Sequence, residues 1–220
     1  MSGLFLTFEG GEGSGKSTQL ELLAQWLEGR GRRVFCTREP GGTPLGERIR
    51  DGLLGPWAGG MDPLAELLLF EADRAQHVAE VIHPRLEAGE VVLCDRFTHS
   101  TLAYQAFGRG LPEEMVARLN AWAAGGLEPD LTLVLDVDAE EGLRRLAEVG
   151  RLDRLEAEAL DFHRRVCEGF RKLARRDAQR VRLIPPSSVT ETHRAIVKAV
   201  KEVLEWAGRP SAGSERPSLP

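Results

Sequence analysis

The chain has 220 residues, 42% of them hydrophobic and 29% charged, which is typical of one globular domain that can bury a core. Its formal net charge of −5 argues against a general basic surface for nucleic acid or membrane, so an anionic substrate must be met by local positive charge. No apolar run approaches the roughly 18 residues of a membrane helix. A strand-like run begins at residue 4 and leaves no room for a signal peptide, so we expect a cytoplasmic protein.

The first apolar run, residues 4–8, leads into a glycine-rich segment, residues 10–17, that fits the phosphate-binding pattern G-x-x-x-x-G-K-[ST]. Leucines at helical spacing follow, which gives the strand–loop–helix context that this motif requires. Backbone N–H groups of the loop and the helix start would surround phosphate oxygens. Lys16 would reach the β- and γ-phosphates, and the Ser17 hydroxyl would ligate Mg²⁺. The alternative is a turn that only joins a strand to a helix. The expected nucleotide-binding residues are Gly10, Gly11, Glu12, Gly13, Ser14, Gly15, Lys16, Ser17 and Thr18.

Four more apolar runs read as strands, and they alternate with segments of helical periodicity. The strands are expected at residues 33–37, 91–94, 131–137 and 181–184. The helices are expected at residues 45–54, 63–89, 98–107, 112–124, 139–147, 156–177 and 190–206. This alternation predicts a three-layer α/β P-loop domain over residues 1–207, with a five-stranded parallel sheet covered by helices. The Gly/Pro/Ser-rich residues 208–220 are expected to be disordered. Cys36 and Cys94 lie in strand-like runs and are expected to be buried free thiols.

Ligands of such folds gather beyond the carboxyl ends of the strands. Two acidic residues stand there: Glu9 closes the first strand, and Asp95 closes the third. An acidic residue after an apolar strand is the second acidic element of P-loop enzymes, where it orients Mg²⁺, so Asp95 is a candidate metal residue with Ser17. The alternative for Asp95 is a cap for the helix that follows it.

Several further blocks together resemble the bacterial thymidylate kinases, in order from residue 3 to about residue 205. They are Phe8-Glu9-Gly10, Thr37-Arg38-Glu39-Pro40-Gly41-Gly42-Thr43, Phe70 with Ala72-Asp73-Arg74-Ala75-Gln76-His77, Asp95-Arg96-Phe97-Thr98-His99-Ser100 with Ala103-Tyr104-Gln105, and Leu152-Asp153-Arg154. The resemblance implies a nucleoside monophosphate kinase fold that uses ATP and Mg²⁺ to phosphorylate dTMP to dTDP for dTTP biosynthesis. It also implies a homodimer.

The resemblance assigns roles to an acceptor site. Phe70 and Arg74 stand at i and i+4 on one helix face, and in the family they stack on thymine and bond its O4. The alternative is a core Phe70 beside a surface Arg74. Arg38 and Arg96 follow neighbouring strands, and their guanidinium forks suit the acceptor phosphate.

The segment after Arg96 supplies two more i, i+4 pairs. Ser100 and Tyr104 form one pair, and Thr101 and Gln105 form the other. By resemblance, Thr101 and Gln105 approach the thymine edge, and Tyr104 packs against the deoxyribose, where it disfavours a 2′-hydroxyl. Ser100 and Glu9 complete the expected substrate-binding set.

Phosphoryl transfer needs positive charge on the transferring group. The variable part of the glycine loop holds no arginine, so the sequence resembles the family members whose catalytic arginine comes from a lid, here residues 145–156. Arg154 is the first candidate for the γ-phosphate and Arg151 the second, with Arg145 also available. With Lys16, Glu9 and Arg96 they make up the expected catalytic set. This lid departs from many others, which carry further arginines at positions 147–149.

Three other functions stay open. A kinase for another nucleotide or nucleoside would differ in the pocket set of Phe70, Arg74, Thr101, Tyr104 and Gln105. A P-loop ATPase or GTPase switch is disfavoured because the chain has no N-K-x-D sequence and no second Walker domain. A non-catalytic nucleotide-binding module is disfavoured by Lys16, Ser17, Asp95 and the lid arginines occurring together.

Overall fold

A computed structural model describes residues 3–55, 60–148 and 153–207. The five strands form one parallel sheet in the order β2-β3-β1-β4-β5, which confirms the expected α/β P-loop architecture. The strands are β1 (Leu4–Glu9), β2 (Val34–Arg38), β3 (Val91–Asp95), β4 (Leu131–Leu135) and β5 (Val181–Ile184). Because β1 lies between β3 and β4, the glycine loop leaves the centre of the sheet.

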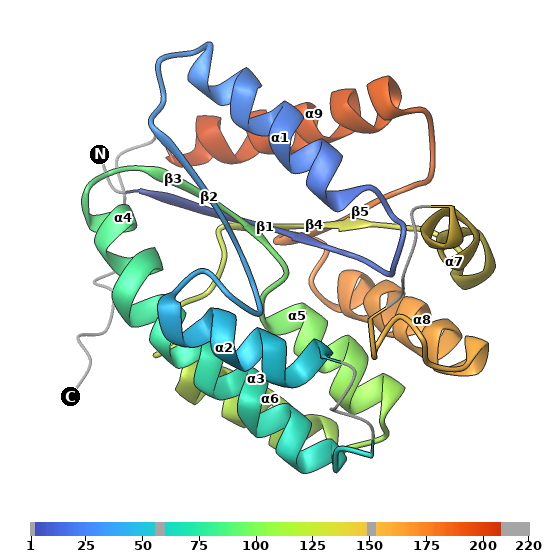
Figure 1. Cartoon of the computed structure of the whole chain (residues 1–220). Helices are drawn as coiled ribbons and strands as arrows, with labels where there is room; N and C mark the ends of the chain where they lie inside the picture. Colours follow the sequence, from blue (N-terminus) through green and yellow to red (C-terminus); the bar gives the residue numbers. More distant parts are fainter. Residues whose placement is uncertain (1–2, 56–59, 149–152, 208–220) are drawn as a thin grey trace.

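Helices cover the sheet on both faces, with α1 and α9 on one side and α3, α5, α6 and α8 on the other (Figure 1). The helical segments are α1 (Lys16–Glu28), α2 (Pro44–Leu54), α3 (Pro63–His77), the π-helix η2 (Val78–Ile82), α4 (His83–Glu87), α5 (Thr98–Thr101), the π-helix η3 (Leu102–Gly108), α6 (Glu113–Ala123), α7 (Ala139–Ala147), α8 (Leu160–Arg176) and α9 (Val189–Ala207). Among the described residues, no helix has the length and apolar character needed to cross a bilayer.

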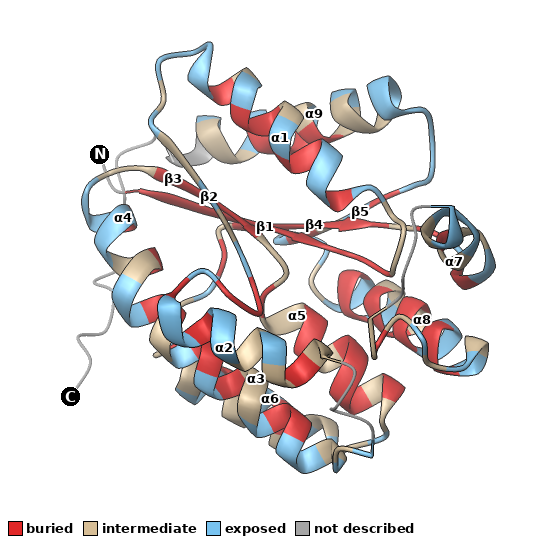
Figure 2. Cartoon of the chain, viewed as in Figure 1, coloured by how far each residue is buried: buried red, intermediate tan, exposed pale blue. Residues whose placement is uncertain are grey.

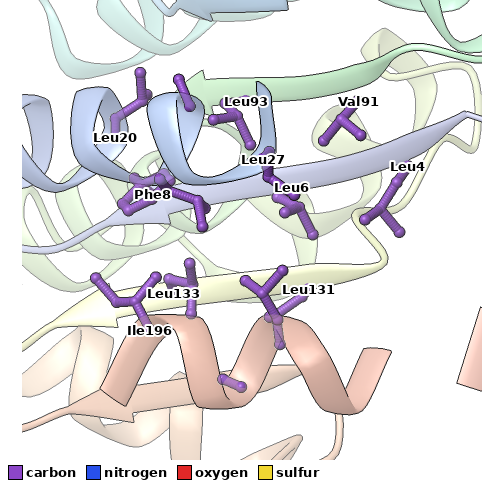
Figure 3. Packing of buried hydrophobic residues seen from close by; sticks show 14 of the residues in the cluster. Leu4, Leu6, Phe8, Leu20, Leu27, Val91, Leu93, Leu131, Leu133 and Ile196 are labelled. Atoms are coloured by element: carbon purple, nitrogen blue, oxygen red, sulfur yellow. The ribbon is translucent and has the colours of Figure 1, made fainter. Parts of the chain in front are cut away.

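The central strand β1 is buried along its whole length because its alternating side chains feed two cores. Leu4, Leu6 and Phe8 pack towards α1 and α9, together with residues of β3 and β4 (Figure 3). Phe5 points to the opposite face and joins the cluster that contains Phe97. Each fully buried side chain of this kind stabilises the fold by about 1.5–3 kcal/mol. The sheet is therefore a rigid support for the loops at its carboxyl edge.

The prediction for Cys36 is wrong, because its strand lies at the edge of the sheet. β2 pairs only with β3, and its side chains are half-buried or exposed, in contrast to those of β1 and β4 (Figure 2). Cys36 is exposed, whereas Cys94 on β3 is buried as expected. All three cysteines are free thiols. An apolar run in the sequence does not distinguish an edge strand from a central one.

Helix boundaries agree closely with the expected ones. Asp62 caps α3 by accepting from the backbone N–H of Leu64 and Ala65, and Pro63 occupies the first turn. The expected helix at residues 63–89 contains a π-helical turn at Val78–Ile82, and that at residues 98–107 is mostly π-helical. The strand expected at residues 131–137 ends at Leu135, and the helix expected from residue 156 begins at Leu160. The expected disordered tail, residues 208–220, and part of the lid, residues 149–152, lie outside the described residues.

Candidate active site

The glycine loop joins β1 to α1, as the motif predicts. Gly15 caps α1 in the left-handed conformation, with φ 87°, and Gly13 has φ 63°. A Cβ atom on Gly13 would also collide with the backbone of Gly142 in α7, so this position requires glycine for two reasons. The tight turn brings the start of α1, with Ser17 and Thr18, to the edge of a large cavity.

Lys16 is a buried cation beneath this loop. Its Nζ donates to the carbonyl oxygens of Gly10 (3.2 Å) and Gly11 (3.0 Å) and to the Oγ of Ser14 (3.3 Å). Burial, and next the nearby charge of Arg96, lower the pKa of Lys16. An anionic ligand at this place would offset both effects, so the loop is suited to phosphate.

Asp95 ends β3 directly beside the loop. Its Oδ2 accepts a hydrogen bond of 3.1 Å from the Oγ of Ser17. Its Oδ1 is buried and has no hydrogen-bond partner among the described residues. A carboxylate oxygen without a partner, next to a hydroxyl and a phosphate loop, fits a hard cation such as Mg²⁺.

Glu9 lies below the cavity rather than in its lining. It is fully buried, and its oxygens accept from the backbone N–H of Phe97 (2.9 Å) and from the Oγ of Ser100 (2.5 Å). Burial raises the pKa of Glu9 to about 7, against the opposing effects of Ser100 and Arg96. Arg96, the residue directly before Phe97, has φ 72°, which is costly for a residue with a side chain. Glu9 therefore braces the turn that carries Arg96.

Arg96 is the centre of a network above Glu9. Its Nη2 pairs with the Oε1 of Glu12 at 2.9 Å, and its Nη1 donates to Ser100 at 3.2 Å. The Tyr104 hydroxyl donates to the same Glu12 oxygen, and the guanidinium carbon of Arg96 lies 5.0 Å from the centre of the Tyr104 ring. Burial opposes ionisation of Glu12, but the Arg96 charge and further contacts outweigh it and lower the pKa. The Glu12 carboxylate in the glycine loop is thus ionised and held by Arg96 and Tyr104.

Two arginines approach the cavity from β2 and α2. Arg38 is half exposed and forms two hydrogen bonds of 2.9 Å with the carboxylate of Glu47. Arg50 lines the same cavity, although it was not among the residues expected from the sequence. Its spacing was the available signal: Arg50 is four residues after Gly46 and three before Leu53, and both are buried, so it occupies the inward face of α2.

The four residues expected around a base do meet. Phe70 and Arg74, one turn apart on α3, line the cavity together with Thr101 and Gln105 from α5 and η3. Arg74, Thr101 and Gln105 are each at most 2% exposed. Aromatic and polar side chains converging in this way suit a flat ring with hydrogen-bonding edges.

Arg74 is not the surface charge of the alternative interpretation. Its guanidinium donates to Glu39 (3.0 Å), Glu71 (3.0 Å), Asn120 (2.5 Å) and Thr101 (2.9 Å). Burial opposes its charge, but the carboxylates of Glu39 and Glu71 outweigh burial and raise the pKa of Arg74. The result is a permanently charged, immobilised guanidinium at one end of the cavity.

The positions of the lid arginines do not follow the order in which the sequence ranks them as candidates for the γ-phosphate. Arg154 donates to a backbone carbonyl of α2 (2.8 Å) and pairs with Glu66 (2.6 Å), and it does not line the cavity. Arg145, on α7, instead donates to the carbonyl oxygen of Gly13 in the glycine loop at 3.3 Å. Arg151 lies outside the described residues.

The cavity has a volume of about 420 Å³, and Glu9, Arg145 and Arg154 lie outside its lining. Its lining includes the glycine loop with Lys16, then Asp95 and Arg96. It also includes what we call the base-type residues, Phe70, Arg74, Thr101 and Gln105. Glu39, Asp153 and Glu156 also line it, and no motif pointed to them individually. The arrangement can hold a phosphate group at the loop and a planar ring beside Phe70.

Comparisons with known proteins agree with this geometry. The family model for thymidylate kinase matches residues 8–196. A thymidylate kinase from Pelotomaculum thermopropionicum is 53% identical over 207 residues, which cover 93% of this chain and 96% of that relative. One from Gloeobacter violaceus is 54% identical and covers 91% of this chain and 96% of its own length. The crystal structure of a thymidylate kinase from Ehrlichia chaffeensis superposes with a TM-score of 0.76 at 35% identity, over 91% of this chain and 99% of that one. The chain belongs to the thymidylate kinase family.

Proposed function

We propose that this chain transfers the γ-phosphoryl group of ATP to dTMP and releases ADP and dTDP. One observation carries the proposal: the phosphate loop and the base-type residues Phe70, Arg74, Thr101 and Gln105 line the same cavity. A kinase must place donor and acceptor phosphates in line and within contact distance, and most of its rate enhancement comes from that placement and from charge compensation.

Different positive groups along the cavity bind the phosphates of ATP and the phosphate of dTMP. Lys16 and the loop N–H groups hold the donor phosphates. Arg96, fixed by Glu12 and by the turn that Glu9 braces, addresses the phosphate of dTMP. Arg38 and Arg50 are further cations for that phosphate, and both line the cavity.

At the other end, thymine stacks on Phe70, and Arg74, Thr101 and Gln105 bind its edge. Tyr104 is held in place by the Glu12 carboxylate and by edge contacts with two aromatic rings of α8. A ring fixed in this way can pack against a deoxyribose and exclude a 2′-hydroxyl, which supports a deoxynucleotide as acceptor.

Ser17 and Asp95 would hold Mg²⁺, since the unpartnered Asp95 oxygen and the Ser17 hydroxyl fit such an ion. When bound, Mg²⁺ neutralises charge on the β- and γ-phosphates. A lid arginine would supply further positive charge to the transferred phosphoryl group. Arg154 is our first candidate for this role, and Arg145, which contacts the glycine loop at Gly13, is another.

We also propose that the protein acts in the cytoplasm as a homodimer. Leu45 on α2 and Leu64 and Leu68 on α3 are between 43% and 49% exposed, and α2 packs on α3. Exposed apolar side chains on two neighbouring helices support a contact with a second copy of the chain.

The test is a coupled assay of ATP consumption with dTMP, dUMP, dCMP, AMP or GMP as acceptor, and with no acceptor. We expect the highest kcat/KM with dTMP and no turnover above background without an acceptor. A higher kcat/KM with another monophosphate would refute the proposal that dTMP is the acceptor. ATP hydrolysis that does not depend on an acceptor would favour a P-loop ATPase.

A further inference from the structure

Glu66 is a fully buried carboxylate on α3 for which the proposed mechanism has no role yet. Its Oε1 accepts from the Nε2 of Gln105 (2.8 Å) and from the Nε of Arg109 (3.1 Å). Its Oε2 accepts from the Nη2 of Arg109 (3.0 Å) and from the Nη2 of Arg154 (2.6 Å). One carboxylate thus joins the base-type residue Gln105 to two arginines behind the cavity.

These contacts decide which way the Gln105 amide points. Burial would raise the pKa of Glu66, but the hydrogen bonds from Arg109, Gln105 and Arg154 outweigh it and lower the pKa, so Glu66 is ionised and only accepts. A flipped Gln105 would place its carbonyl oxygen against this carboxylate, two acceptors facing each other in a buried site. The NH₂ group therefore faces Glu66, and the carbonyl oxygen is the atom that Gln105 can offer to the cavity.

Thr101 is oriented by the same logic. Its Oγ1 accepts from the Nη2 of Arg74 at 2.9 Å, so its own proton points away from that arginine. Thr101 and Gln105 are one helical turn apart and line the same cavity. They present a hydroxyl donor next to a carbonyl acceptor.

We propose that Glu66 is a positioning residue for selection of the acceptor base, because it fixes the Gln105 carbonyl towards the cavity and so favours a pyrimidine with a proton on N3. Thymine and uracil carry N3–H next to a carbonyl oxygen, which complements an acceptor next to a donor. Cytosine carries an unprotonated N3 next to an amino group, the opposite pattern. Cytosine would leave buried polar groups facing like groups, which a binding site rejects strongly. This inference rests on the proposed function.

The test compares Glu66→Gln with a matched control in steady-state assays with dTMP, dUMP and dCMP. A glutamine at this position can face Gln105 with either its carbonyl or its NH₂ group, so the Gln105 amide is free to flip. Glu158→Gln is the control: Glu158 pairs with the Nη1 of Arg109 (2.6 Å), and among the described residues the side-chain amide of Gln105 donates to Glu66 instead.

For Glu66→Gln we expect the ratio of kcat/KM for dTMP over dCMP to fall at least about tenfold, and the ratio for dTMP over dUMP to stay within about twofold, since both bases carry N3–H. Glu158→Gln should keep both ratios. A general loosening of the fold would lower all three activities together, and that result, or an unchanged dTMP/dCMP ratio in an active variant, would overturn the inference. If the wild-type enzyme shows no turnover with dTMP, the proposed function itself has failed.

A second measurement needs no variant. In the wild-type protein, NMR of bound dTMP labelled with ¹⁵N at N3 should show an imino proton that exchanges slowly with water and lies close to the Gln105 side chain. An imino proton that exchanges as fast as in free dTMP would contradict the orientation that Glu66 imposes.

Discussion

The variant Glu9→Gln distinguishes a structural role of the Glu9 carboxylate, which supports the turn at Arg96, from a catalytic role. The structure also predicts how this variant changes stability. Glu9 has a pKa of about 7 in the folded protein, against an ordinary value of 4.5 for a glutamate. Between these values the folded state binds more protons than the unfolded state, so the free energy of unfolding falls as pH rises. The rise in pKa from 4.5 to about 7, at about 1.4 kcal/mol per pH unit, amounts to about 3 kcal/mol, lost fully above about pH 7.

Glutamine keeps the shape of Glu9 and cannot ionise. Relative to the wild type, Glu9→Gln should therefore gain about 3 kcal/mol in unfolding free energy between about pH 4 and pH 8. Urea denaturation of both proteins across this range measures the difference, and other titrating groups cancel because they are shared. Glu87→Gln, at an exposed position on α4, is the matched control and should show no such gain.

Activity provides the second half of this test. In Glu9→Gln the new amide can still accept from the Phe97 N–H and bond Ser100, so the turn that carries Arg96 should persist and kcat should stay within about tenfold of the wild type. A general base that touches the substrate would lose about 10²–10⁴-fold instead. Parallel pH–stability curves, or a loss of that size in kcat, would refute the bracing role.

Four further variants test the remaining assignments. Lys16→Met should lower kcat by about 100-fold or more with little change in the unfolding midpoint, and near-normal turnover would contradict its role at the phosphates. Arg154→Ala should lower kcat far more than it weakens dTMP binding, measured by steady-state kinetics and calorimetry; an unchanged kcat together with a loss in Arg145→Ala would move the role to Arg145. Leu68→Glu should yield a monomer in light scattering, whereas a mass equal to that of the wild type would place any dimer contact elsewhere.

Local signals in the sequence were sufficient for the fold. Gly15 and Lys16 are recognised by short-range spacing, and Asp62 with Pro63 marks a helix start, because a helix cap and a phosphate loop are built from neighbouring residues. The parallel sheet follows from the alternation of strands and helices. The edge position of Cys36 does not, since strand order depends on packing between segments that are distant in the chain.

The same distinction applies to the site. Phe70 and Gln105 were expected from motifs, and the structure brings them into one cavity. The contacts that hold the motif residues could not be read from the sequence: Arg74 with Glu39, and Glu66 with Arg154, join positions 35 and 88 residues apart. A carboxylate in the first turn of a helix, such as Glu66 in α3, looks in the sequence like an ordinary solvated charge, although its partners bury it.

Phosphorus-31 NMR of a reaction with ATP, Mg²⁺ and dTMP measures phosphoryl transfer most directly. Passage of the γ-phosphoryl group from the glycine loop to an acceptor in the same cavity predicts that the signals of dTDP and ADP grow together, one for one, as those of ATP and dTMP disappear. Accumulation of inorganic phosphate while dTMP stays intact would contradict the proposed kinase reaction.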